Sequence, residues 1–344
     1  MVYDVLVIGA GQAGLSMGYF LKQTKLKFLI LDKGNEIGET WKIRYDSLTL
    51  FTPRTYCSLP GLALDGEEKH YPTKDEISNY LNLYTNTFSL PIQLNTWVTM
   101  LDKKHDKFII YTTQGEYQSK NVIVATGPFQ KPNIPEFSQL ISENILQLHS
   151  SNYKNTNQLK QGTTLVVGGG NSGAQIAVEI SKENKVYLSI GQRLKFLPQD
   201  IGSKSIFLWF DKLGILKANV HSKIGQFIKN KPDPIFGFEL KSQLKNGRVV
   251  LKPRVTSADK NNIFFDDNSS LKVSNVIWTT GFKSDYSWIN IPIVLDEKGH
   301  PIHQRGITTI NGLFFLGLPW QYRRGSALLQ GIGTDAKYLV DKLI

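Results

Sequence analysis

Short apolar runs, each followed by a glycine-rich turn and an apolar-patterned helix, occur twice along the chain. The first run, Asp4–Ile8, is rich in β-branched residues and is typical of a strand buried in a parallel sheet. A turn with the sequence GAGQAG follows at Gly9–Gly14, and the helical pattern continues to Leu21. A second apolar run, Lys27–Leu31, ends at Asp32. This order predicts one Rossmann-like dinucleotide-binding unit at the start of the chain.

Each glycine of the first turn has a separate predicted task. Gly9 permits the tight turn, Gly11 removes the side chain where a pyrophosphate must approach, and Gly14 lets the helix pack close to the strand. The start of the helix offers free N–H groups to the phosphates. Asp32 lies 18 residues after Gly14, where a carboxylate that binds the ribose is expected.

The second occurrence runs from strand Thr164–Val167 through the turn GGGNSG at Gly168–Gly173 to a helix over Ala174–Ser181. The following strand, Lys185–Ile190, carries no carboxylate at its end, and Arg193 comes soon after it. An arginine suits the 2′-phosphate of NADPH, which an acid would repel. Lys195 could serve instead, and Arg193 could also be a solvated surface residue. Two such units favour one held cofactor, FAD, and one exchanging hydride donor, NADPH, with NADH open as an alternative.

Two later strands end in small-residue turns, Ala125-Thr126-Gly127 and Thr280-Gly281, which we expect to let the backbone pass close to a dinucleotide. The stretch Ile37–Pro53 has no helical or strand period and is predicted to be a functional loop. Near the end of the chain, Thr334 is predicted to cap a helix that reaches Leu343, with Asp335 in its first turn. We expect an α/β chain with an FAD domain of residues 1–150 and 280–344 and an NADPH domain of residues 151–279.

Composition narrows the functional classes. The 344 residues suffice for two domains, and no apolar run approaches the roughly 20 residues that span a bilayer, so we expect a cytoplasmic protein without membrane insertion. The net charge is +11, but the lysines are scattered, and no nucleic-acid recognition motif surrounds them. One cysteine, Cys57, excludes an internal disulfide and a CxxC redox pair. We predict no metal site.

Most of the chain resembles bacterial flavin-containing monooxygenases, the class B flavoprotein monooxygenases, and in particular their compact branch, which is related to Baeyer–Villiger enzymes. The motifs that carry this resemblance are GAGQAG, GETW, RYDSL, YPTKDE, ATGPF, GGGNSG, TTGF and RGSALLQGIG. The resemblance, together with the turns above, implies two sets of cofactor residues. The FAD set is Gly9, Gly11, Gln12, Ala13, Gly14, Asp32, Lys33, Thr40, Trp41, Arg44, Ser47, Leu48, Val98, Ala125, Thr126, Gly127 and Gln330. The NADPH set is Gly168, Gly170, Asn171, Ser172, Gly173, Arg193, Thr280 and Gly281.

The chemistry that the resemblance implies is reduction of FAD, capture of O2 as a C4a-(hydro)peroxyflavin, and oxygen transfer to a nitrogen, a sulfur or a carbonyl carbon of a small organic molecule. Phe51 and Trp320 are candidates for the flavin side of the site. Many N-oxygenating members have an asparagine where Phe51 stands, and a phenyl ring cannot donate a hydrogen bond to a peroxide. We therefore expect hydrogen peroxide to leak.

A second departure lies at Glu143–Tyr153, which aligns with the family signature F-x-G-x-x-x-H-x-x-x-Y. His149 and Tyr153 are kept, but the phenylalanine and the glycine are not. His149 is therefore either catalytic or a domain-junction residue with one backbone hydrogen bond. Two other functions stay open: an NAD(P)H oxidase or flavin reductase of the same fold, and a dinucleotide-binding accessory or redox-sensing protein. A homodimer also stays open.

Overall fold

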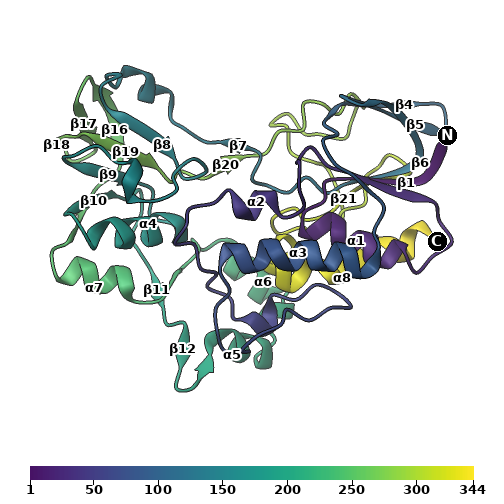
Figure 1. The fold of residues 1–344 in the computed structure, drawn as a ribbon, viewed down its shortest axis with the longest axis horizontal. Helices are drawn as coiled ribbons and strands as arrows, with labels where there is room; N and C mark the ends of the chain where they lie inside the picture. The colour runs from purple at the N-terminus through teal and green to yellow at the C-terminus, as the bar shows by residue number, and fades with distance from the viewer.

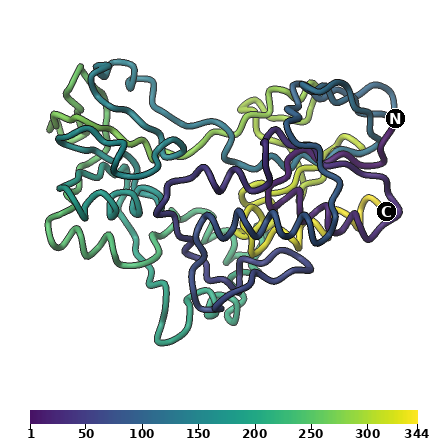
Figure 2. The backbone as a smooth tube through the Cα atoms, viewed as in Figure 1, coloured from purple at the N-terminus to yellow at the C-terminus, as the bar shows by residue number.

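The computed structural model describes all residues, 1–344, and contains two α/β units that lie side by side (Figure 1). Each unit is built on its own sheet, which is mixed in the first unit and wholly parallel in the second. Both termini lie at the outer end of the first unit, on the right in Figure 2. Two short strands, β7 (Lys131–Pro132) and β20 (Phe282–Lys283), pair antiparallel where the chain passes between the units. The two Rossmann-like units predicted from the sequence are therefore present.

The first sheet has the order β3-β2-β1-β6-β5-β4, and β21 pairs with β6. Its parallel part places β1 between β2 and β6, while β4, β5 and β6 form an antiparallel meander. Apolar residues of helices α1, α3 and α8 form one core on one face of the sheet, and the chain from Tyr286 to Val294 covers the other. The strands and helices are β1 (Val2–Ile8), β2 (Phe28–Leu31), β3 (Ile92–Gln93), β4 (Val98–Lys104), β5 (Lys107–Thr112), β6 (Gly115–Val124), β21 (Leu313–Phe315), α1 (Gln12–Leu21), α3 (Lys74–Phe88) and α8 (Leu329–Leu343).

The second sheet is wholly parallel, with the order β15-β10-β9-β19-β8. Helices α4 and α7 pack on one face, and a three-stranded antiparallel sheet packs on the other. The elements are β8 (Leu146–His149), β9 (Thr164–Val167), β10 (Val186–Ser189), β15 (Val249–Lys252), β19 (Asn275–Trp278), α4 (Asn171–Ser181), α7 (Glu239–Lys245), β16 (Val255–Asp259), β17 (Asn262–Phe265) and β18 (Ser270–Lys272).

A long connection joins β10 to α7 and packs against the first unit. It holds β11 (Phe196–Leu197), β12 (Asp200–Ile201), β13 (Lys204–Ser205), α5 (Ile206–Lys212), η4 (Ile215–Lys217), α6 (Lys223–Lys229) and β14 (Ile235–Phe236). The backbone N–H of Val220 donates to the carbonyl of Tyr322 at 2.8 Å, and Arg324 forms an ion pair with Asp233 at 2.9 Å. This connection therefore links the second unit to the segment that precedes α8.

Two predicted elements differ from the structure. The C-terminal helix begins at Leu329 rather than near Thr334, so Thr334 is not its cap, and Asp335 lies inside the helix, fully buried and paired with Arg305. The glycines that precede Thr334 are helical because they permit close packing: a Cβ on Gly331 would lie 2.3 Å from the carbonyl oxygen of Gly325. The predicted loop Ile37–Pro53 contains one helical turn, α2 (Glu39–Lys42). No helix is long and apolar enough to cross a membrane.

Candidate functional site

In the first glycine turn, Gly9 and Gly14 pack closely against backbone atoms, whereas Gly11 has no neighbouring atom at its Cβ position. Gly9 has a φ of +109°, and a Cβ there would lie 2.6 Å from the carbonyl oxygen of Ala125 at the end of β6. A Cβ on Gly14 would lie 1.8 Å from the carbonyl oxygen of Gly9. Gly11 instead faces open space, since a Cβ there would meet no atom within 4 Å. The turn therefore presents bare backbone to a ligand at the start of α1, as a pyrophosphate requires.

The second turn repeats this geometry. Gly168 has a φ of +122°, and a Cβ there would lie 2.4 Å from the carbonyl oxygen of Thr279. A Cβ on Gly173 would lie 2.0 Å from the carbonyl oxygen of Gly168, whereas one on Gly170 would again meet nothing within 4 Å. In both units the first glycine lies against the chain that leaves a later strand, β6 or β19. The two turns therefore have equivalent open geometry, and we call them the first and second cradle.

Two further glycines, Gly127 and Gly281, follow those later strands. Both have positive φ, +68° and +82°, and both face open space. Thr126 and Gly127 are held by Gln130, whose Nε2 lies 3.1 Å from Thr126 Oγ1 and 2.8 Å from the Gly127 carbonyl. The predicted small-residue turns thus lie beside the two cradles, one in each unit.

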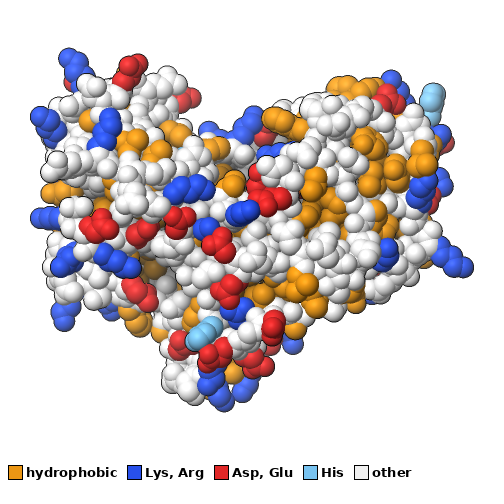
Figure 3. Space-filling view, in the orientation of Figure 1, with side chains coloured by type: hydrophobic (Ala, Val, Ile, Leu, Met, Phe, Trp, Pro, Cys, Tyr) orange, Lys and Arg blue, Asp and Glu red, His pale blue; other side chains and the backbone are white.

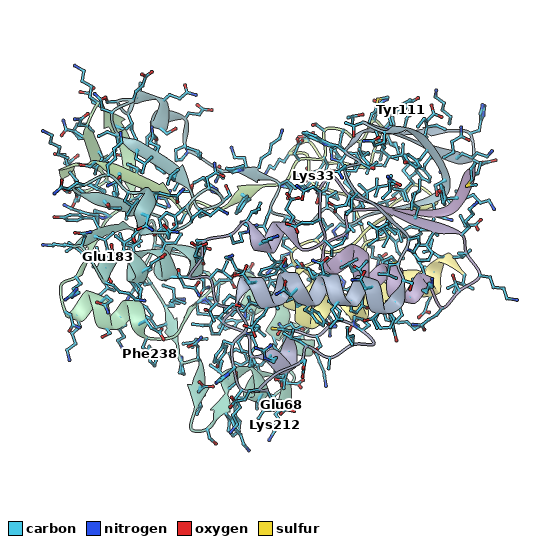
Figure 4. The ribbon with its side chains drawn as sticks, in the orientation of Figure 1. Lys33, Glu68, Tyr111, Glu183, Lys212 and Phe238 are labelled. Carbon is cyan, nitrogen blue, oxygen red and sulfur yellow. The ribbon has the colours of Figure 1, made fainter.

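Asp32 stands at the edge of the first cradle. Its carboxylate accepts hydrogen bonds from the backbone N–H groups of Ala10, at 2.5 Å, and Gly34, at 2.7 Å. These bonds fix the end of β2 to the glycine turn. Lys33 follows Asp32, is exposed, and lies in Figure 4 on the side of the first unit that faces the second. The structure therefore places Asp32 at the edge of the first cradle, where the sequence predicts a carboxylate that binds a ribose.

The second cradle has no carboxylate at the equivalent place. Ile8 pairs with Leu31 in the first sheet, and Val167 pairs with Ser189 in the second, so Ile190 stands where Asp32 does. Ile190 packs beneath the turn, because a Cβ on Gly169 would lie 2.9 Å from its side chain. A 2′-phosphate would meet no nearby acid from this strand.

Arg254 is a basic residue at this cradle that the sequence pattern did not single out. Its guanidinium lies against Gly191, with Nη2 and Nε 2.8 and 3.0 Å from the position of a Cβ there. Arg254 follows β15, which pairs with β10, whereas Arg193 follows β10 itself. Both side chains belong to exposed residues. No local motif could have revealed Arg254, because the pairing of two strands far apart in the sequence brings it here.

Arg44 lies where the two units meet. Its guanidinium is 5.4 Å from the ring centroid of Phe129 and 5.0 Å from that of Phe282, and its Nε donates to the carbonyl of Thr40 at 3.1 Å. No carboxylate forms an ion pair with it, and burial lowers the pKa of Arg44. This cation is thus held by aromatic faces and leaves its terminal N–H groups for an anion.

Some predicted flavin residues contact the second unit. Ser47 donates to Glu179 of α4 at 2.9 Å, and Leu48 packs against the core of the second unit, whereas Trp41 packs on the core of the first. Phe51 stacks on Phe236 of β14 with ring centroids 4.7 Å apart. The segment from Arg44 to Phe51 is therefore a bridge between the units.

The remaining predicted residues are spread along the first unit. Val98 is buried at the start of β4, and Gln12 donates from Nε2 to the carbonyl of Ala327 at 3.2 Å. Gln330, in the first turn of α8, has a buried Oε1 without a hydrogen-bond partner. Trp320 has a φ of +56°, which is strained for a bulky side chain. An unpartnered buried acceptor and a strained aromatic residue are both features of ligand sites.

His149 makes the hydrogen bond expected of a junction residue. Its Nε2 lies 2.9 Å from the carbonyl oxygen of Gly281, and its Nδ1 lies 2.9 Å from Ser151 Oγ. The ring meets Phe282 edge to face, with centroids 4.8 Å apart. Burial lowers the pKa of His149 below its ordinary value. His149 therefore positions the Gly281 turn.

We expect the free energy of unfolding to fall as the pH drops below the ordinary histidine value of about 6.5. The reason is that unfolded His149 takes up a proton there while the folded residue resists it, so the unfolded state binds more protons. Above that pH the contribution is fully present. Urea titrations across this range should show the decline in the wild type and a shallower one in His149→Asn. The exposed His70→Gln is the control and should match the wild type; equal slopes for all three proteins would contradict the assignment.

Comparison with known proteins supports the geometry. Residues 6–200 match the family described as pyridine nucleotide-disulphide oxidoreductase. The chain is 56% identical over 343 residues to a protein of Geobacillus kaustophilus named "Uncharacterized oxidoreductase CzcO-like", covering 100% of this chain and 99% of that protein. It is 27% identical over 333 residues to the "Probable indole-3-pyruvate monooxygenase YUCCA9" of Arabidopsis thaliana, covering 86% of this chain and 79% of that one. A flavin-containing monooxygenase from Stenotrophomonas maltophilia superposes with a TM-score of 0.85 at 25% identity, over 99% of this chain and 98% of that one. The predicted resemblance to flavin-containing monooxygenases is confirmed.

Proposed function

The chain belongs to the pyridine nucleotide-disulphide oxidoreductase family and is an oxidoreductase, and on that premise we propose that it is an FAD- and NADPH-dependent monooxygenase. It would place one oxygen atom of O2 into a small molecule with a nitrogen, a sulfur or a carbonyl group. The observation that carries this proposal is the pair of equivalent open cradles, at Gly11 and at Gly170. One cofactor alone would need only one of them.

The residues present fit the two dinucleotides. Open space over Gly11 and the carboxylate of Asp32 suit the ADP half of FAD. The buried Oε1 of Gln330 has no hydrogen-bond partner in the protein and could accept a hydrogen bond from the cofactor. Open space over Gly170 suits the pyrophosphate of NADPH, and Arg254, which lies against Gly191, and Arg193, two residues after Gly191, suit its 2′-phosphate. When bound, FAD supplies the redox chemistry that links NADPH to O2. We propose an FAD domain and an NADPH domain on the same grounds, but the first boundary falls before residue 150, because β8 (Leu146–His149) pairs with β19 in the second sheet.

The chain itself provides binding, orientation and exclusion of water. Arg44, without a carboxylate partner, would hold an anionic group of a dinucleotide between the units. His149 holds the carbonyl of Gly281 and so fixes the second small-residue turn. Phe51, Phe207 and Phe236 stack between the long connection and the first unit and keep water out of that contact.

Dithiol chemistry does not suit this chain, despite the family's name. Cys57 is its one cysteine, and it is buried. Burial raises the pKa of its thiol to about 12, so the thiolate needed for exchange with a disulfide is scarce near neutral pH. Electrons taken from NADPH must leave by another route, and O2 is the acceptor that we propose.

The function is tested by a balance of three quantities: NADPH consumed, hydrogen peroxide released, and oxygenated product formed from an organic sulfide. We expect the amount of oxygenated product to equal the NADPH consumed minus the hydrogen peroxide released. Peroxide equal to the NADPH consumed, for sulfides, amines and ketones alike, would overturn the monooxygenase and leave the second candidate, an NAD(P)H oxidase or flavin reductase. Phe51 favours that candidate, because its ring, stacked on Phe236, offers no hydrogen bond. NADPH oxidation too slow for turnover would instead leave an accessory or redox-sensing role.

Coenzyme preference provides a separate prediction. Arg193→Ala and Arg254→Ala should each raise the KM for NADPH about tenfold, because a charged hydrogen bond contributes about 1.5 kcal/mol, and leave the KM for NADH nearly unchanged. Arg248→Ala is the matched control, since that side chain instead donates to the carbonyls of Ser181 and Lys182. Steady-state kinetics with both coenzymes measure this. An equal rise in the KM for NADH would show that neither arginine binds the 2′-phosphate.

A further inference from the structure

The long connection between β10 and α7 carries a second feature that the dinucleotide sites do not explain. Between Ile201 and Lys231 it contains six lysines and one acidic residue, Asp211, a net charge of +5. The same stretch holds five of the exposed large hydrophobic side chains of the protein: Ile201, Trp209, Leu213, Ile224 and Phe227. We call residues 201–231 the basic-apolar segment. Single exposed apolar side chains are ordinary, so the grouping of five of them in one lysine-rich stretch is the feature that needs an explanation.

Helix α5 has apolar residues on both of its faces. Ile206 and Phe207 are buried against the first unit and the aromatic stack that includes Phe51. Trp209 and Leu213, one helical turn apart, are exposed, and Leu213 keeps 67% of its surface accessible. Lys212 lies beside them, with its ammonium 5.7 Å from the ring centroid of Trp209. The inner face therefore anchors the helix, and nothing in the fold covers the outer one.

Helix α6 repeats the arrangement. Ile224 and Phe227 lie three residues apart and are 52% and 65% exposed, whereas Gly225 between them is buried. Lys223 and Lys229 stand at the two ends of the helix, and the ammonium of Lys231 lies 4.9 Å from the ring centroid of Phe227. Exposed aromatic rings flanked by lysines are typical of segments that rest in the headgroup region of a bilayer.

Acidic groups occur at the first half of the segment, where Asp200 directly precedes it and Asp211 lies within it. Asp211 forms an ion pair with Lys217 at 3.7 Å, and Asp233, beyond the segment, pairs with Arg324. Glu68 and Lys212 both lie at the lower edge of the molecule in Figure 4, and the mixture of red and blue side chains there is visible in Figure 3. No acidic residue occurs from Lys212 to Pro232. Within the segment, α6 and the residues on either side of it therefore contain lysines and no acidic residue.

We propose that the basic-apolar segment docks this enzyme on an anionic phospholipid bilayer. Trp209, Leu213, Ile224 and Phe227 would enter the boundary between headgroups and acyl chains, and the lysines would lie among the lipid phosphates. The exposed apolar side chains gain burial, and each lysine near an anionic surface adds attraction that salt weakens. Charge favours an anionic lipid surface over a second copy of this chain, because the segment of a second copy carries the same net charge of +5 and would repel the first.

The test is co-sedimentation of the purified full chain with large vesicles at low and high salt. One set of vesicles is phosphatidylcholine alone, and the other is phosphatidylcholine and phosphatidylglycerol in equal parts. We expect binding to the anionic vesicles only, weakened by salt. Lys223→Gln, Lys229→Gln and Lys231→Gln together should lower vesicle partitioning about a hundredfold, and Ile224→Ser with Phe227→Ser should abolish it.

Matched controls lie outside the segment. Leu83→Ser with Ile134→Ser removes two exposed apolar side chains, and Lys182→Gln, Lys241→Gln and Lys245→Gln remove three exposed lysines. Both control proteins should sediment as the wild type does. The proposal would be overturned if the segment variants bound anionic vesicles as well as the wild type does, or if the wild type bound neither set of vesicles. So would a wild-type dimer in light scattering that Ile224→Ser with Phe227→Ser converts to a monomer, because a second copy would then be the occupant. Vesicle binding and light scattering do not depend on monooxygenase activity, so this test is independent of the proposed function.

Discussion

Gly11→Val should yield a folded protein that purifies without flavin, whereas Gly170→Val should keep the flavin and lose its reduction by NADPH. Both glycines have ordinary extended backbone, with φ of −76° and −80°, so valine strains neither turn. Both face open space, which the valine methyl groups would fill at the place where a pyrophosphate must lie. A steric cost of about 3 kcal/mol weakens binding at either site by about a hundredfold.

The measurement is the flavin absorbance per chain, followed by anaerobic addition of NADPH. Circular dichroism of both variants checks that the fold is kept. Each variant serves as the control for the other, because the same substitution is made in two equivalent turns. A Gly11→Val protein with a full complement of flavin, or a Gly170→Val protein that NADPH reduces as fast as the wild type, would contradict the assignment of the cradles.

Gly14→Ala and Gly173→Ala should destabilise the fold itself, each by about 3 kcal/mol or more. A Cβ at these positions would lie 1.8 and 2.0 Å from the carbonyl oxygens of Gly9 and Gly168, so the helix must move away from its strand. Urea unfolding, monitored by circular dichroism, measures the loss of stability. A variant too unstable to fold would be insoluble.

Gly11→Ala is the matched control for Gly14→Ala, because its Cβ meets nothing within 4 Å. It should cost less than about 1 kcal/mol. Unfolding midpoints that agree among Gly11→Ala, Gly14→Ala and the wild type would show that the third glycine of the turn has no packing task.

The two nucleotide-binding units could be predicted because their signals are local. Strand β9 spans the predicted Thr164–Val167, and α1 ends at the predicted Leu21. Apolar runs, glycine spacing and helical periodicity all act within about 30 residues of chain, the length of one βαβ unit. The same reasoning explains why each small-residue turn could be located, since it directly follows a strand.

Features set by distant packing could not be predicted. The sequence predicts that α8 starts near Thr334 rather than at Leu329, because the close packing of Gly331 against Gly325 and of Gly333 against Pro60 is visible only in the fold. Arg254 was missed because only the pairing of β15 with β10 brings it to Gly191. The bridge at Ser47 and Leu48 depends on how the two units pack, which no local pattern reports.

We propose that the two cradles of this chain hold a flavin and a nicotinamide coenzyme that exchange a hydride. An anaerobic titration of the purified wild-type protein with NADPH, monitored by the flavin absorbance, tests this exchange. We predict a yellow protein whose flavin is bleached by one equivalent of NADPH. A protein that stays colourless after incubation with FAD, or a bound flavin that NADPH leaves oxidised, would contradict the account.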